Sequence, residues 1–161
     1  LPTINGITQS PGQKYGATEV SHQAKKNRST MRLDISQAYP SEAGINNYRR
    51  SLTLDRGKQV TVEDHFELSV AEAITHHLMI IFPAKVTQPG ILTIPFEDGE
   101  GRNRDFTLNY NAKKMEVSVE KIPLTAPEDQ GIITKWGDTI YRINFEMKEP
   151  MNKDKVRFVL K

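Results

Sequence analysis

The chain has 161 residues, 37% of them hydrophobic and 26% charged, and this length suits one domain with a continuous apolar core, so we expect residues 1–161 to form a single domain. Its 22 basic residues nearly balance its 20 acidic ones, which argues against a dedicated nucleic-acid-binding protein but allows a local basic groove for an anionic sugar. The absence of cysteine excludes disulfides, thiolate zinc sites and cysteine nucleophiles, and no apolar run approaches the ~18 residues of a transmembrane helix.

Alternation of apolar and polar residues with a period of two recurs along the chain and predicts β-strands rather than helices. The first two predicted strands, 18–26 and 29–36, are close enough to pair. The next two, 48–54 and 60–68, are joined by a short turn that contains Gly57, which is typical of a β-hairpin.

Segment 73–82 carries apolar residues on both faces, which predicts a central strand covered on both sides. The one helix candidate is a single turn near 70–72. Further alternating segments complete the set of predicted strands: 91–96, 105–110, 115–119, 139–147 and 156–160. Many short strands separated by evenly spread turn residues predict an all-β fold, an antiparallel β-sandwich of two packed sheets.

Asp64 is unusual because it lies on the apolar face of its predicted strand, and a buried carboxylate needs hydrogen bonds or a cation. Arg49 or Arg50 on the partner strand can supply the cation, so we expect a buried ion pair; the alternative is a carboxylate that faces a functional groove. His76 and His77 are adjacent on a predicted strand and therefore point to opposite faces, one into the core and one outward.

Candidate catalytic clusters are few. Glu63, His65 and Glu67 alternate on one strand face and form a conceivable two-carboxylate, one-histidine metal site, although a solvated strand face is the simpler interpretation. No nucleophile elbow is present, and Gly99-Glu100-Gly101 is interpreted as a hairpin loop because no strand-to-helix context surrounds it.

Amide, phenol and guanidinium side chains gather toward the N-terminal part of the chain. Amides suit sugar hydroxyls, aromatic rings suit sugar C–H faces, and arginine forks suit carboxylates and sulfates. This part of the chain therefore offers candidate contacts for a carbohydrate, among them Asn5, Gln9, Tyr39 and Arg49.

Three segments carry a resemblance to a known family: 2–12, 33–40, and 48–57 running into 60–64. In order and content they resemble the C-terminal β-sheet domain of heparinase II/III-like polysaccharide lyases. Asn5 and Gln9 match the family motif within segment 2–12, and Tyr39 and Arg49 match family positions that can equally be structural. The resemblance therefore implies these four as the candidate substrate-binding residues. Beyond these motifs only the rhythm of strands is similar.

The resemblance implies that the chain is the C-terminal part of a larger lyase, in which a helical toroid and a β-sandwich enclose an acidic polysaccharide such as heparin or heparan sulfate. Cleavage in the family is β-elimination, in which a base removes the proton α to the uronate carboxylate. The family's catalytic tyrosine, asparagine and histidine lie mainly on the toroid, and a metal-binding histidine is expected upstream of this chain. We therefore assign no catalytic residue and no metal ligand here.

The resulting hypothesis is a domain that supports the toroid and walls the substrate cleft, inactive alone, in a bacterial periplasmic or secreted protein. Its expected partners are the acidic polysaccharide and the toroid, with no nucleic acid and no membrane. The alternatives are an independent carbohydrate-binding module or a structural interaction domain. Exposure of Trp136 beside another aromatic residue favours the module, and an exposed apolar patch favours the interaction domain.

Overall fold

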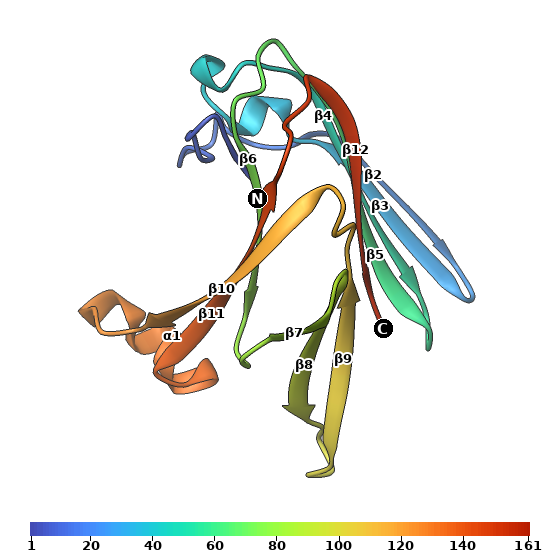
Figure 1. The fold of residues 1–161 in the computed structure, drawn as a ribbon, viewed down its shortest axis with the longest axis vertical. Helices are drawn as coiled ribbons and strands as arrows, with labels where there is room; N and C mark the ends of the chain where they lie inside the picture. Colours follow the sequence, from blue (N-terminus) through green and yellow to red (C-terminus); the bar gives the residue numbers. More distant parts are fainter.

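The computed structural model describes all of residues 1–161, which form two antiparallel β-sheets (Figure 1). The smaller sheet contains, in spatial order, β1 (Thr3–Ile4), β6 (Ile74–Ile80), β11 (Thr139–Met147) and β10 (Met115–Pro123). The larger sheet contains β2 (Thr18–Lys25), β3 (Arg28–Asp34), β4 (Ile45–Asp55), β5 (Gln59–Leu68), β12 (Lys153–Leu160), β9 (Asn103–Asn109), β8 (Ile91–Glu97) and β7 (Lys85–Gln88). The two sheets pack together, so the predicted all-β sandwich is confirmed.

The predicted hairpins are confirmed, and their register follows from the alternation of the sequence. In the β4–β5 hairpin, Tyr48 lies opposite Phe66 and Arg50 lies opposite Asp64. All four side chains lie on the face that packs against the smaller sheet, because residues two apart on a strand share a face. A slip of one residue would expose Phe66 and bury His65, which fixes the pairing.

The core lies between the two sheets and is rich in aromatic residues. Tyr48 stacks on Phe66 at 5.5 Å between ring centroids, and Phe145 of β11 contacts Phe158 of β12 at 4.7 Å. Each of these rings is less than a tenth exposed, so each contributes roughly 1.5–3 kcal/mol by leaving water. The contact between Phe145 and Phe158 joins the two sheets, whereas the Tyr48–Phe66 pair packs within the larger sheet.

Helical structure differs from the prediction. The expected turn of helix near 70–72 does not form: this segment is irregular, and the backbone N–H groups of Glu72 and Ala73 donate to Oδ1 of Asn5 instead of to a helical carbonyl. The α-helix is instead α1 (Gln130–Trp136), which at seven residues is too short to show a helical period. Three 3₁₀ turns occur: η1 (Ser36–Ala38), η2 (Ser41–Ala43) and η3 (Pro127–Asp129). None of these helices is long and apolar enough to cross a membrane.

Strand β6 is central in its sheet, but the expectation that both of its faces are covered is wrong. Ile74 and His76 are buried against the larger sheet, whereas Met79 on the other face is 47% exposed. The smaller sheet packs against a second sheet on one side only, so the outward apolar residues of β6 lack a cover.

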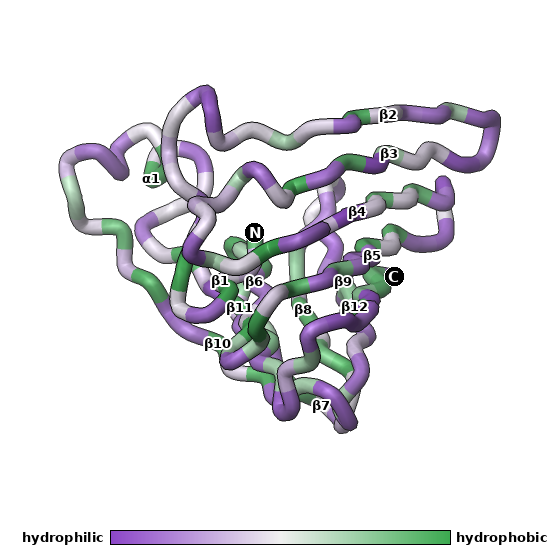
Figure 2. Tube along the Cα trace, turned by 90° about the horizontal axis from the view of Figure 1, so that it is seen from above, coloured by the Kyte–Doolittle hydropathy of each residue, from purple (hydrophilic) through white to green (hydrophobic).

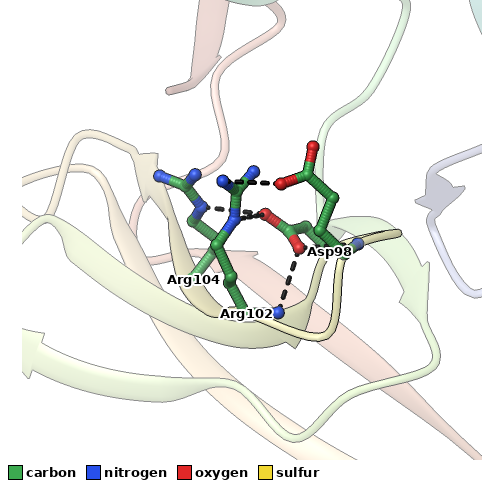
Figure 3. A network of polar contacts seen from close by, with 4 residues as sticks. Asp98, Arg102 and Arg104 are labelled. Atoms are coloured by element: carbon green, nitrogen blue, oxygen red, sulfur yellow. Dashed lines mark hydrogen bonds and ion pairs between the residues drawn. The ribbon is translucent and has the colours of Figure 1, made fainter.

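The loop between β8 and β9 is a hairpin loop, as predicted, and a single carboxylate organises it (Figure 3). Asp98 accepts hydrogen bonds from the backbone N–H groups of Glu100 and Arg102, both at 3.0 Å. The guanidinium groups of Arg102 and Arg104 also donate to it, at 2.9 and 3.1 Å. The backbone bond from Arg102 and the two arginine contacts hold the pKa of Asp98 below its usual value.

Candidate functional site

Asn5, the first of the predicted substrate-binding residues, uses its whole carboxamide to bind backbone. Its nitrogen donates to the carbonyl of Val70 at 3.0 Å, while its oxygen accepts from Glu72 and Ala73 at 2.9 and 3.3 Å. Asn5 also has φ of 52°, a left-handed conformation that asparagine tolerates better than most residues. The side chain of Asn5 thus links the N-terminal segment to the residues just before β6.

Gln9 and Tyr39 lie in the same region of the molecule as Asn5. The amide of Gln9 donates to the carbonyl of Tyr15 at 3.3 Å, within the N-terminal loop. Tyr39 is 5% exposed, and its hydroxyl donates to the carbonyl of Pro2 at 2.6 Å. Burial raises the pKa of Tyr39 well above its usual value, so its hydroxyl stays protonated and acts as a donor.

Arg49 lies apart from the other three, on the outer face of the larger sheet. Its side chain is 62% exposed and contacts Glu19 at 3.3 Å and Asp34 at 3.9 Å. The structure therefore brings Asn5, Gln9 and Tyr39 into one region but does not bring Arg49 to them. A substrate-binding role for these four residues stays a prediction.

Arg49 lines a polar pocket of about 430 Å³ on this outer face, which we call the central pocket. Three arginines and three carboxylates border it, so its charge is mixed: Arg32, Arg49, Arg50, Glu19, Asp34 and Glu63. Such a pocket can hold a carboxylate or sulfate on the exposed fork of Arg49, in competition with the neighbouring carboxylates.

The conceivable metal site on β5 does not assemble. Nε2 of His65 lies 2.9 Å from Oε1 of Glu63, and this contact, with Lys155, holds the pKa of Glu63 below its usual value. Glu67 pairs instead with Lys153 at 3.0 Å. Glu63 and His65 therefore contact each other while Glu67 is engaged elsewhere, and the chain contains no group of three or more potential metal ligands.

The predicted buried ion pair at Asp64 is present, and its partner is Arg50. The Arg50 guanidinium donates to both carboxylate oxygens at 2.6 Å, and the Tyr48 hydroxyl donates to Oδ2 at 2.9 Å. Nδ1 of His76 lies 3.4 Å from the same oxygen, too poorly aligned for a hydrogen bond. Asp64 is fully buried, so this bidentate contact with Arg50 is what keeps its charge inside the sandwich.

The titration of this cluster follows from its geometry. Burial by itself raises the pKa of Asp64, but the hydrogen bonds from Arg50 and the contact with His76 outweigh it and hold the pKa well below the usual range. Burial and the nearby Asp64 charge raise the pKa of Tyr48. At neutral pH Asp64 is therefore a carboxylate paired with the Arg50 guanidinium, and Tyr48 is a neutral phenol.

His77 takes the opposite face of β6 from His76, as predicted. Its ring nitrogens lie 2.8 Å from the hydroxyl of Thr3 and 2.8 Å from Oδ1 of Asn144, on the two neighbouring strands. Partial burial lowers the pKa of His77, which favours the neutral ring. His77 is thus hydrogen-bonded to both neighbouring strands, whereas both ring nitrogens of the buried His76 lack a hydrogen-bond partner.

An apolar groove of about 500 Å³ is lined by residues of both sheets and of α1, and the sequence did not predict it. Eleven side chains line it and all are hydrophobic; they come from β6, the segment that follows it, β8, β9, α1, β11 and β12. Four of them are strongly exposed: Trp136 (54%), Met79 (47%), Phe106 (45%) and Ile81 (38%). The apolar run through Ile81 was the one sequence signal for it, and that run was interpreted as covered strand.

Comparison with known proteins gives fold relatives only. No protein-family model and no curated protein matches the chain. The structure of heparan sulfate lyase HepC from Pedobacter heparinus is similar with a TM-score of 0.61 and 12% identity, over 89% of this chain and 21% of that one. The heparinase III-BT4657 gene product gives a TM-score of 0.63 and 15% identity, over 99% of this chain and 22% of that one.

The predicted resemblance to heparinase-like lyases is therefore confirmed for the fold. Identities of 12–15% show shared architecture and no more. The chain spans about a fifth of the length of the lyases that it resembles.

Proposed function

We propose that the chain is the β-sandwich domain of a polysaccharide lyase that cleaves uronate-containing polysaccharides by β-elimination. In this proposal it supports a catalytic domain and walls the substrate cleft, without catalysing the reaction alone. The observation that supports it is a fold shared over 89–99% of this chain with about a fifth of the heparan sulfate lyase HepC and of the heparinase III-BT4657 gene product. A bacterial periplasmic or secreted location accompanies the proposal.

The apolar groove supports a docked partner domain. A soluble domain seldom leaves a large apolar patch open unless a partner covers it, and this groove exposes four large side chains. We propose that the catalytic domain of the parent protein covers this groove, which joins the two domains and fixes the substrate cleft between them.

The rival function, an independent carbohydrate-binding module, draws support from Trp136. This residue is exposed and shares the groove with Phe106, an arrangement that can stack on a sugar ring. However, apart from the indole N–H of Trp136, the groove has no lining side chain that can hydrogen-bond sugar hydroxyls. Its chemistry therefore fits an apolar protein surface better than a sugar.

The first experiment incubates the chain with heparan sulfate and records the ultraviolet absorbance of the unsaturated product. We expect no increase above buffer, because the groups needed for proton abstraction belong to the proposed partner domain. Sustained turnover by the purified chain would refute the assignment of the chemistry to that domain.

The second experiment measures binding of heparan sulfate by calorimetry at low and moderate salt. We expect salt-sensitive binding that Arg49→Ser weakens about two- to fivefold, the effect of losing one exposed ionic contact. Arg142→Ser is the control, since Arg142 is a partly exposed arginine, 41% accessible at its side chain, that pairs with Glu120 on the other sheet. Equal weakening by both substitutions would count against a substrate role for Arg49.

A further inference from the structure

Two hairpins, β2–β3 and β4–β5, extend side by side beyond the core, and their tips are strongly hydrophilic (Figures 1 and 2). Between them lies a groove of about 780 Å³ with no hydrophobic lining side chain, which we call the hairpin-tip groove. It contains one carboxylate, Asp55, and six basic residues: Lys25, Lys26, Arg28, Arg32, Arg56 and Lys58.

Backbone contacts fix the shape of this groove. The Arg56 guanidinium donates to the carbonyls of Lys25 and Lys26 at 2.7 and 3.1 Å, and the Arg56 backbone N–H donates to the carbonyl of Asn27 at 3.0 Å. These three bonds tie the turn of one hairpin to the turn of the other. The basic residues on both turns are therefore held at a defined spacing.

Most of the positive charge in the groove is uncompensated. Arg28 pairs with Asp55 at 2.5 Å, while Lys25, Lys26, Arg32 and Lys58 take part in no ion pair. Like charges held close together repel, so their proximity costs stability unless an anion offsets it.

Protection of a sheet edge is the simplest alternative explanation. Lysines on an edge strand prevent pairing with another chain, and β2 is the edge strand of the larger sheet. That explanation accounts for Lys25 but not for Arg32 on β3 or Lys58 on the β4–β5 turn, both of which lie inside the edge. The cluster spans two hairpins, as expected for a binding surface.

We propose that the hairpin-tip groove binds a sulfated or carboxylated polysaccharide, at a site beyond the central pocket. Sulfate and carboxylate groups suit the free lysines and Arg32, and sugar hydroxyls suit the side chains of Gln23, Asn27 and Thr30, which also line the groove. Single-stranded nucleic acid fits less well, because its binding relies on aromatic stacking platforms and this groove has no aromatic residue.

The groove continues into the central pocket. Arg32 lines both, and it lies four residues from Arg28 on β3, a distance of roughly 13 Å along the strand. One anionic chain lying along β3 therefore passes from the hairpin tips to Arg49. This inference goes beyond the proposed function, because it assigns polysaccharide binding to a surface remote from the apolar groove.

The test compares a triple variant, Lys25→Ser, Lys26→Ser and Lys58→Ser, with a charge-matched control, Lys85→Ser, Lys121→Ser and Lys135→Ser. The control lysines are exposed, outside the groove and in no ion pair. Calorimetry with heparin at low salt is expected to show about tenfold weaker binding for the groove variant and little change for the control, since three exposed ionic contacts of this kind together amount to about tenfold.

Neutral dextran and a single-stranded oligonucleotide complete the test. No binding of heparin by the unchanged chain, equal losses in both triple variants, or equal binding of dextran would overturn the inference. Tighter binding of the oligonucleotide than of heparin through the same lysines would replace the carbohydrate with a nucleic acid. Binding that depends on Arg49 but not on the lysines refutes this inference alone and leaves the proposed function intact.

Discussion

The substitution Asp64→Asn tests the buried cluster most directly. Asparagine keeps the size of the side chain and can still accept from Tyr48, but it leaves the Arg50 guanidinium without a counter-charge at a site where Asp64 is fully buried. Removing one partner of a buried ion pair costs about 3–5 kcal/mol, and we expect the lower end because the amide retains hydrogen bonds.

Urea unfolding followed by circular dichroism measures this loss. With a slope of roughly 2 kcal/mol per molar urea, a loss of about 3 kcal/mol lowers the midpoint by about 1.5 M. Asp55→Asn is the control, because Asp55 pairs with Arg28 at the exposed hairpin tip and its loss should shift the midpoint far less. The double variant Arg50→Met/Asp64→Asn should lose less than the sum of the two single losses, since it removes the unpaired charge.

The pH dependence of stability provides an independent test of the contribution of Asp64. The pKa of Asp64 is lower in the folded chain than its ordinary value of 3.8, so the unfolded chain binds the proton more tightly. Its contribution to stability is complete above about pH 5 and is lost as pH falls through the acid range. The difference in unfolding free energy between the unchanged chain and Asp64→Asn should therefore narrow below pH 4. A constant difference, or a midpoint shift as small as that of Asp55→Asn, would refute the reasoning.

Three further predictions concern the hydrogen bonds that hold the N-terminal segment and the apolar groove. Asn5→Ala should lower the free energy of unfolding by about 2–3 kcal/mol, because it removes the hydrogen bonds of the side chain and places alanine at a positive φ. Asn5→Gly should cost about 1 kcal/mol less, because glycine tolerates that φ. Equal losses of the two variants in urea unfolding would exclude the contribution of backbone strain. Tyr39→Phe should cost about 1–3 kcal/mol in the same assay, because the buried carbonyl of Pro2 loses its donor, and an unchanged midpoint would contradict this. Trp136→Ser should reduce the fluorescence of a bound hydrophobic dye, whereas Met151→Ser, equally exposed but outside the groove, should not; equal reductions would show that the dye does not report on the groove.

Much of the fold followed from local alternation. The period of two identified the strands of both hairpins, placed Asp64 on the inner face of β5 and separated His76 from His77. These inferences hold because successive side chains in a strand point to opposite faces, whatever the rest of the fold. The short helix α1 was not predicted, because seven residues are too few to show a helical period.

The candidate site depended more on contacts between strands and segments far apart in the sequence, which a local pattern does not predict. Whether Arg49 or Arg50 would meet Asp64 was settled by the β4–β5 register, which places Arg50 opposite Asp64 and leaves Arg49 on the outer face. Asn5 matched a motif in the sequence, but only the tertiary structure showed that its side chain accepts hydrogen bonds from Glu72 and Ala73, which lie far away along the chain.

By itself, the sequence determined an all-β chain, its hairpins and one buried carboxylate, because strand periodicity and the cost of burying a charge are local properties. Only the tertiary structure decided which surfaces the chain presents. The apolar groove joins Leu78, Ile94 and Trp136, and the hairpin-tip groove joins the turns of two hairpins. Both surfaces arise from the order of strands within the sheets, which long-range pairing sets and local sequence does not.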